Sequence, residues 1–164
     1  SSNKMQIPSY KSTLLILGGL YFSIQLLLPI RHHFIKDDVL WTEEGHRLSW
    51  RMMLRSRSGK VKFRVVDPKT KEETIVNLEE HLTRKQNRRI GSYPDFIWQF
   101  AQRIKKSHAQ NGKVISVYVT SRVSVNGKPF RAFIDPKVDL ANTKWNYFWH
   151  NEWILPSNKH KIPK

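Results

Sequence analysis

The sequence predicts an α+β protein in which one transmembrane helix is followed by a small, mostly antiparallel sheet with one or two packed helices. Three observations predict this class. An uncharged apolar stretch occupies residues 13–30. Short segments of alternating apolar residues follow it, separated by turn signals such as Asn126-Gly127. Between two of these segments, an apolar stripe with helical spacing runs over residues 96–104.

Residues 13–30 predict a membrane span. They carry no charge, and Gln25 is their only strongly polar side chain. A stretch of this length is typical of a transmembrane helix, and the alternative is a buried helix in a soluble core. We therefore expect residues 1–31 to form the transmembrane helix with its flank and residues 32–164 to form an extramembrane α+β domain. The lipid bilayer is then a predicted partner.

Apolar alternation predicts the strands, and turn residues delimit them. Strands are expected near residues 48–54, 61–65, 74–76, 114–125 and 130–134. Asn77 is expected to cap a short helix through its side chain. Ser92 is predicted to cap a longer helix, with Pro94 in its first turn and Asn111-Gly112 at its end.

The protein is strongly basic and contains no cysteine. Its 164 residues carry a formal net charge of +16. Such a charge favours an anionic partner: nucleic acid, anionic lipid or an acidic peptide. Residues 83–90 are especially basic and are expected to be exposed. The absence of cysteine excludes disulfides, thiol nucleophiles and cysteine zinc sites. The seven histidines lack metal-ligand spacing, and no metal site is predicted.

Arginines are dense around residues 47–57. Arg47, Arg51, Arg55 and Arg57 are all odd-numbered, so in an extended strand they share one face, opposite the apolar even-numbered residues. A guanidinium group binds a carboxylate through two parallel hydrogen bonds, which suits a glutamate side chain. The alternative is a solvated basic face over a buried Trp50.

Three ordered motifs resemble the vitamin K-dependent gamma-carboxylase family. The first is a Ser-Trp-x-Met-Met run, with matching residues Ser49, Trp50, Met52, Met53, Ser56, Arg57 and Ser58. The second is an Asp-Pro-x-Val-Asp run, with Asp135, Pro136, Val138 and Asp139. The third is the spacing of Trp145, Phe148, Trp153 and Pro156. Together they cover most of the chain after the apolar stretch.

The resemblance implies the last membrane span and the C-terminal extramembrane domain of a multi-span protein, here a bacterial relative. Members couple oxygenation of vitamin K hydroquinone to removal of a γ-proton from peptidyl glutamate, to which carbon dioxide then adds. Their catalytic lysine lies in the N-terminal membrane half. We therefore expect this chain to be a fragment that is not catalytic alone. It would contain no cofactor, with vitamin K hydroquinone serving the full-length protein, and would associate with the remaining transmembrane half or other membrane subunits.

The resemblance also implies a location and a site. The domain is expected on the periplasmic or lumenal side, although the positive charges after the span would place it in the cytoplasm. The predicted substrate-binding residues, for an acidic Glu-containing peptide, are Trp50, Met53, Arg55 and Arg57, and no catalytic residue is assigned. Arg55 stands where the family has a histidine, so the imidazole chemistry of that position is absent.

Other interpretations stay open at this point. The rival function is a non-enzymatic membrane-anchored basic module that binds anionic lipid or a partner subunit. Nucleic-acid binding is not expected, because no recognised module is present. Glu43 and Glu44 are expected to cap a helix or pair with a neighbouring arginine. Asp135-Pro136 predicts a structural corner. The tryptophans at helical spacing predict core packing or an interfacial belt: Trp145, Trp149 and Trp153.

Overall fold

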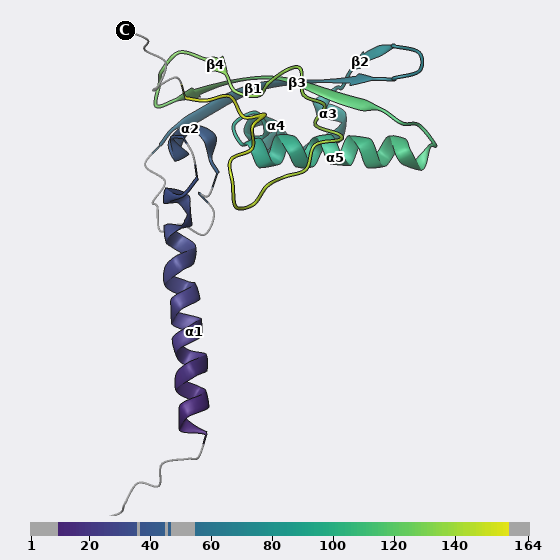
Figure 1. Cartoon of the computed structure of the whole chain (residues 1–164). Helices are drawn as coiled ribbons and strands as arrows, with labels where there is room; N and C mark the ends of the chain where they lie inside the picture. Colours follow the sequence, from purple (N-terminus) through teal and green to yellow (C-terminus); the bar gives the residue numbers. More distant parts are fainter. Residues whose placement is uncertain (1–9, 36, 45, 47–54, 158–164) are drawn as a thin grey trace, which may run out of the picture.

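A long helix extends away from a sheet with helices on one side (Figure 1). The computed structural model describes residues 10–35, 37–44, 46 and 55–157. The long helix, α1 (Lys11–Ile30), is followed by a short 3-10 helix, η1 (Arg31–His33), and by α2 (Val39–Thr42). The predicted α+β class is confirmed. The strand expected near residues 48–54 lies outside the described residues.

The side chains of α1 are exposed almost all round. Pro29 alone among the residues of α1 is buried, and leucine and isoleucine side chains on every side are open. Twenty residues of helix span about 30 Å, the thickness of the hydrocarbon part of a bilayer. A soluble-core helix would bury these side chains, so that alternative does not hold for the described chain. The helix is long and apolar enough to cross a membrane.

Four antiparallel strands form the sheet in the order β2-β1-β3-β4. They are β1 (Arg57–Val66), β2 (Glu73–Ile75), β3 (Ser116–Val125) and β4 (Arg131–Ala132). The central pair, β1 and β3, is matched from Arg57↔Val125 to Val66↔Ser116. Asn126 and Gly127 connect β3 to β4 with positive φ angles of 52° and 72°, as a tight hairpin turn requires. β4 is shorter than predicted.

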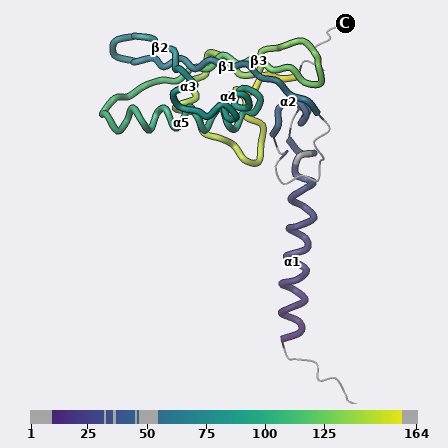
Figure 2. The backbone as a smooth tube through the Cα atoms, turned by 180° about the vertical axis from the view of Figure 1, so that it is seen from behind, coloured from purple at the N-terminus to yellow at the C-terminus, as the bar shows by residue number. Residues whose placement is uncertain are grey.

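Three helices cover one face of the sheet, on the side toward which α1 extends (Figures 1 and 2). They are α3 (Leu78–His81), α4 (Arg84–Ile90) and α5 (Pro94–Gln110). Asn77 caps α3 as predicted, Pro94 lies in the first turn of α5, and Gly112 follows its end with a φ of 68°. The predicted Ser92 cap is wrong. Tyr93 occupies the cap position without a side-chain bond.

The core forms between α5 and the odd-numbered residues of β1 and β3. Phe63 packs edge-on against Phe100, with ring centroids 4.8 Å apart. The predicted helical stripe of α5 is buried at Ile97, Phe100, Ala101 and Ile104. The outward side chains of β1 are polar or basic: Ser58, Lys60, Lys62 and Arg64. Because Arg57 has the same parity as Phe63, it faces the packed side.

Candidate functional site

Two predicted arginines meet an internal carboxylate beneath the sheet. α2 ends at Glu43, which adopts the left-handed conformation with a φ of 64°. The side chains of Arg55 and Arg57 are each 3% exposed, and that of Glu43 is 4% exposed. Arg55 Nη2 donates a short hydrogen bond to Glu43, and Arg57 Nη1 lies 3.4 Å from Glu43 Oε1. The prediction that Glu43 pairs with a neighbouring arginine is confirmed.

Arg57 also binds the backbone of two other segments. Its Nη1 donates to the carbonyls of Leu40 and Trp41, each at 2.8 Å. Its Nε donates to the carbonyl of Ser92, also at 2.8 Å. The guanidinium carbon lies 5.0 Å from the centroid of the Phe133 ring. Arg57 therefore joins α2, β1 and the start of α5.

Burial dominates the titration of this pair. Burial raises the pKa of Glu43 above its usual range, although the charges of Arg57 and Arg55 oppose this and Asp95 adds to it. Burial also lowers the pKa of Arg57 to about 10, against the opposing charge of Glu43. Arg57 thus stays cationic at neutral pH, and its charge is already matched inside the domain.

The structure brings two of the four predicted substrate-binding residues together. Arg55 and Arg57 share Glu43, whereas Trp50 and Met53 lie outside the described residues. The guanidinium groups do not form an open basic face, because Arg57 is turned toward the core. A substrate carboxylate can bind these arginines only if it displaces the Glu43 carboxylate from them. Their substrate-binding role stays a prediction.

A second buried carboxylate lies next to the first. Glu44 Oε1 accepts hydrogen bonds from the backbone and side-chain nitrogens of Asn151, both at 2.7 Å. Glu44 Oε2 lies 2.5 Å from His150 Nδ1. These contacts hold the segment around residue 150 against the segment that follows α1, although 107 positions separate Glu44 from Asn151.

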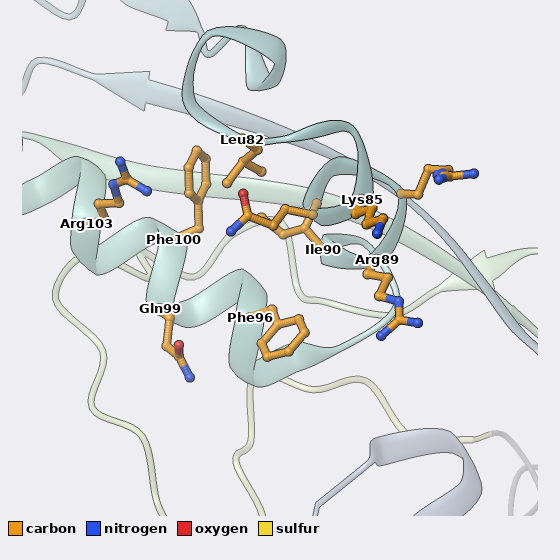
Figure 3. A pocket seen from close by; sticks show the side chains of 10 residues that line it. Leu82, Lys85, Arg89, Ile90, Phe96, Gln99, Phe100 and Arg103 are labelled. Atoms are coloured by element: carbon orange, nitrogen blue, oxygen red, sulfur yellow. The ribbon is translucent and has the colours of Figure 1, made fainter. Parts of the chain in front are cut away.

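The structure also contains a groove that the sequence analysis missed. It lies between α4 and α5 and has a volume of about 930 Å³. Its apolar lining comes from Leu82, Ile90, Phe96 and Phe100, and its basic lining from Lys85, Arg88, Arg89 and Arg103. All four basic side chains are exposed. Ile90, Phe96 and Phe100 lie between Arg103 and Arg89 (Figure 3). We call this the basic groove.

A second cavity of about 610 Å³ adjoins the basic groove. Both are lined by Arg89, Phe96 and Gln99. The second cavity reaches Glu43 and Glu44, and its walls include the aromatic rings of Tyr93, Phe96, Trp98, Trp145, Tyr147 and Trp149. The basic groove and the buried ion pair are therefore linked by neighbouring open space.

The signal for the basic groove was present in the sequence. The basic run over residues 83–90 is largely exposed, as predicted, and it forms α4. Thr83 and Gln86 make a reciprocal capping box at its start. The other half of the signal was Phe96 and Phe100, which were assigned to the core stripe. Phe96 is only half-buried and borders the basic groove instead.

The remaining predicted motifs are structural in the described chain. Asp135 Oδ1 accepts a hydrogen bond from the Lys137 N–H at 2.9 Å, which forms the predicted corner. Asp139 Oδ1 accepts from the Val117 N–H at 2.8 Å. The segment containing Trp145 and Trp149 is not helical. Trp153 is in the core, Trp145 packs against it with centroids 5.7 Å apart, and Trp149 is exposed.

Asp37, in the segment after α1, binds the C-terminal end of the described chain. Its two carboxylate oxygens accept hydrogen bonds from the N–H and the hydroxyl of Ser157, each at 2.7 Å. Nearby, Trp41 Nε1 donates to the carbonyl of Leu155 at 2.7 Å. Burial alone would raise the pKa of Asp37, but the bonds from Ser157 outweigh it and the pKa is lowered.

Replacing Asp37 with asparagine is expected to lower the free energy of unfolding at pH 7 by about 1 kcal/mol. The folded-state pKa of Asp37 lies below its usual value of 3.8, so the carboxylate adds stability above that pH and loses it as the pH falls through the folded-state pKa. Denaturant unfolding should therefore show the gap between wild type and variant narrowing below 3.8. A gap that is constant or widens in acid would contradict the assignment.

One protein family matches nearly the whole described chain. The family described as vitamin K-dependent gamma-carboxylase, lumenal domain, matches residues 10–160. No solved structure matches the chain. The match includes both α1 and the domain, which is consistent with a membrane protein that carries a lumenal domain. This chain therefore belongs to the vitamin K-dependent gamma-carboxylase lumenal domain family.

Proposed function

We propose that the domain binds an acidic, glutamate-containing peptide as the substrate-docking part of a gamma-carboxylase-like membrane protein. The single observation that carries this proposal is the basic groove, in which four exposed cations surround an apolar floor. A peptide that alternates acidic and apolar side chains complements both features at once. Its carboxylates would face the arginines and lysine, and its apolar side chains would cover Phe96 and Ile90.

The second cavity supports a path from docking to the buried ion pair. Both spaces are lined by Arg89, Phe96 and Gln99. When part of a peptide lies in the basic groove, the adjoining residues of that peptide therefore lie next to the second cavity. A glutamate carried there would compete with Glu43 for Arg55 and Arg57. Burial disfavours the charged form of Glu43, since it raises the pKa of that carboxyl group. This weakens the attraction of Glu43 to the two arginines. Trp50 and Met53 remain proposed parts of the same surface.

The cofactor proposal concerns the full-length protein. The ring system of vitamin K hydroquinone is flat and aromatic, and aromatic side chains favour stacked or edge-on contacts with such rings. The aromatic walls of the second cavity, among them Trp98 and Trp145, fit that requirement. The remaining transmembrane half is the proposed partner that supplies the catalytic lysine.

Reversing two charges on the basic groove, Arg89→Glu with Arg103→Glu, should weaken binding of an acidic peptide. The probe is a fluorescent synthetic peptide of alternating glutamate and leucine, titrated against the chain in detergent by anisotropy. Exposed ion pairs contribute up to about 1 kcal/mol each, so the dissociation constant should rise roughly tenfold. Binding by the unchanged chain should also weaken as salt is added.

A matched control carries the same charge change on the opposite face of the sheet. Lys60→Glu with Lys62→Glu alters the exposed side of β1 and leaves the basic groove intact. This control should bind the peptide nearly as well as the unchanged chain, and a peptide with glutamine in place of glutamate should bind weakly to all three. If both double variants lose the same affinity for the peptide, binding depends only on the overall charge of the chain, and the proposed role of the basic groove is wrong.

A further inference from the structure

Three consecutive aromatic side chains are exposed at the tip of one loop. Tyr147, Phe148 and Trp149 are 65%, 63% and 66% exposed, respectively. Large aromatic residues are usually buried or at interfaces, because each ring offers a large apolar area. Three of them together form an exposed apolar patch, which in a folded protein marks a contact with a partner or a membrane. We call residues 147–149 the aromatic loop.

The aromatic loop lies level with the end of α1. The guanidinium carbon of Arg31, the residue directly after α1, is 5.8 Å from the centroid of the Phe148 ring. Phe34, three positions further, is also exposed, at 72%. Both views show the yellow segment descending from the sheet, past α5, toward the domain end of α1 (Figures 1 and 2). If α1 spans the bilayer, the aromatic loop lies at the membrane surface.

The backbone of the aromatic loop is held by side chains of its own domain. Asn146 Oδ1 accepts hydrogen bonds from the N–H groups of Phe148 and Trp149, at 3.0 and 3.1 Å. Asn151 Oδ1 accepts from the Asn146 N–H at 2.8 Å, and Asn151 itself is bound by Glu44. These bonds satisfy backbone N–H groups, whose transfer out of water would otherwise cost free energy. The three aromatic rings are thus carried by a turn whose backbone is fixed by hydrogen bonds within the domain.

We propose that the aromatic loop inserts into the interfacial layer of the lipid bilayer, together with Phe34, and holds the domain to the membrane at a point beside α1. Tyrosine and tryptophan favour this layer, where one end of the side chain meets lipid and the other meets water. Arg31 at the same level suits contact with lipid phosphates. A domain attached only through α1 can swivel about the connection, whereas insertion of the aromatic loop fixes its tilt.

Site-specific fluorescence tests this proposal in the full chain. The sequence has no cysteine, so single variants can be labelled without background. Phe148→Cys and, separately, Trp149→Cys would carry an environment-sensitive NBD dye in phosphatidylcholine vesicles. The control is Thr120→Cys, exposed on the outer face of β3. Both aromatic-loop labels should emit at shorter wavelength than the control and lose emission when lipids bear a nitroxide near the headgroup. The control should show neither change.

Two results would overturn the proposal. In the first, aqueous iodide quenches the aromatic-loop labels as strongly as the label at Thr120, which places the loop in water. In the second, the labels emit at shorter wavelength but nitroxide lipids leave them unquenched. That outcome places the aromatic loop against protein, such as a second copy or other transmembrane segments.

Discussion

Replacing Arg57 with alanine is expected to lower the free energy of unfolding by about 3–5 kcal/mol, because it leaves the buried Glu43 carboxylate with Arg55 alone and removes the donor of three backbone carbonyls. The guanidinium group serves Glu43 and the carbonyls of Leu40, Trp41 and Ser92 together. Glu43 keeps its bond to Arg55, but the three carbonyls lose the charged donor that Arg57 supplies. Denaturant unfolding of the chain in detergent, followed by circular dichroism, measures the loss.

The control is another arginine of the same strand. Arg64 pairs with Glu73 at 3.2 Å, but both side chains are about half exposed. Water replaces that interaction, so Arg64→Ala should cost less than about 1 kcal/mol. Similar losses for the two variants would mean that Arg57 is not buried as described.

The Arg57→Ala variant also distinguishes two possible roles of Arg57. If the residue binds substrate directly, Arg57→Ala loses affinity for the acidic peptide while the fold stays intact. If its main role is structural, binding and stability fall together, and charge reversal on the basic groove has the greater specific effect on binding. Peptide titrations should therefore be made at a temperature where the variant is still folded.

Replacing Gly59 with alanine should be the next most damaging change, at about 1–3 kcal/mol. A Cβ atom on Gly59 would overlap the carbonyl carbon and oxygen of Gly91 and lie 2.5 Å from the Ser92 nitrogen. These are backbone atoms, so they cannot move aside as a flexible side chain does. β1 and the end of α4 must separate, and this shift also moves the Ser92 carbonyl away from Arg57. The melting temperature in detergent reports the loss.

Ser58→Ala is the matched comparison for Gly59. Ser58 is the preceding residue of β1 and points to the outer, exposed face. Its replacement should change the melting temperature little, since no close neighbour is disturbed. An unchanged melting temperature for Gly59→Ala would show that β1 and α4 are not in close backbone contact.

Local patterns in the sequence predicted most of the individual elements. The uncharged stretch predicted α1, the alternation of Val61, Phe63 and Val65 predicted β1, and Asn126-Gly127 predicted the hairpin. These features depend on residues close together in the chain. The same alternation also assigns Arg57 to the packed face, because it is odd-numbered like Phe63. The alternation of the apolar residues 48–54 has the opposite parity, and it predicts an open basic face for the odd-numbered arginines instead.

The site itself depends on contacts that no local pattern contains. Glu44 meets Asn151 across 107 positions, and Arg57 meets the Ser92 carbonyl across 35. The acceptor in the second case is a backbone carbonyl, which has no side-chain signal at all. The basic groove likewise needs α4 and α5 to lie side by side. The charge of residues 83–90 marks three of its basic residues in the sequence, but only the fold brings them next to Arg103 and Phe96.

The bonds from Asp37 to Ser157 and from Trp41 to Leu155 have a consequence for biosynthesis. A ribosome that has released α1 through β4 has not yet delivered either C-terminal partner. The segment after α1 therefore stays incompletely folded until residues 155–157 have been translated. A premature stop codon before residue 155 would leave Asp37 and Trp41 without both of these partners.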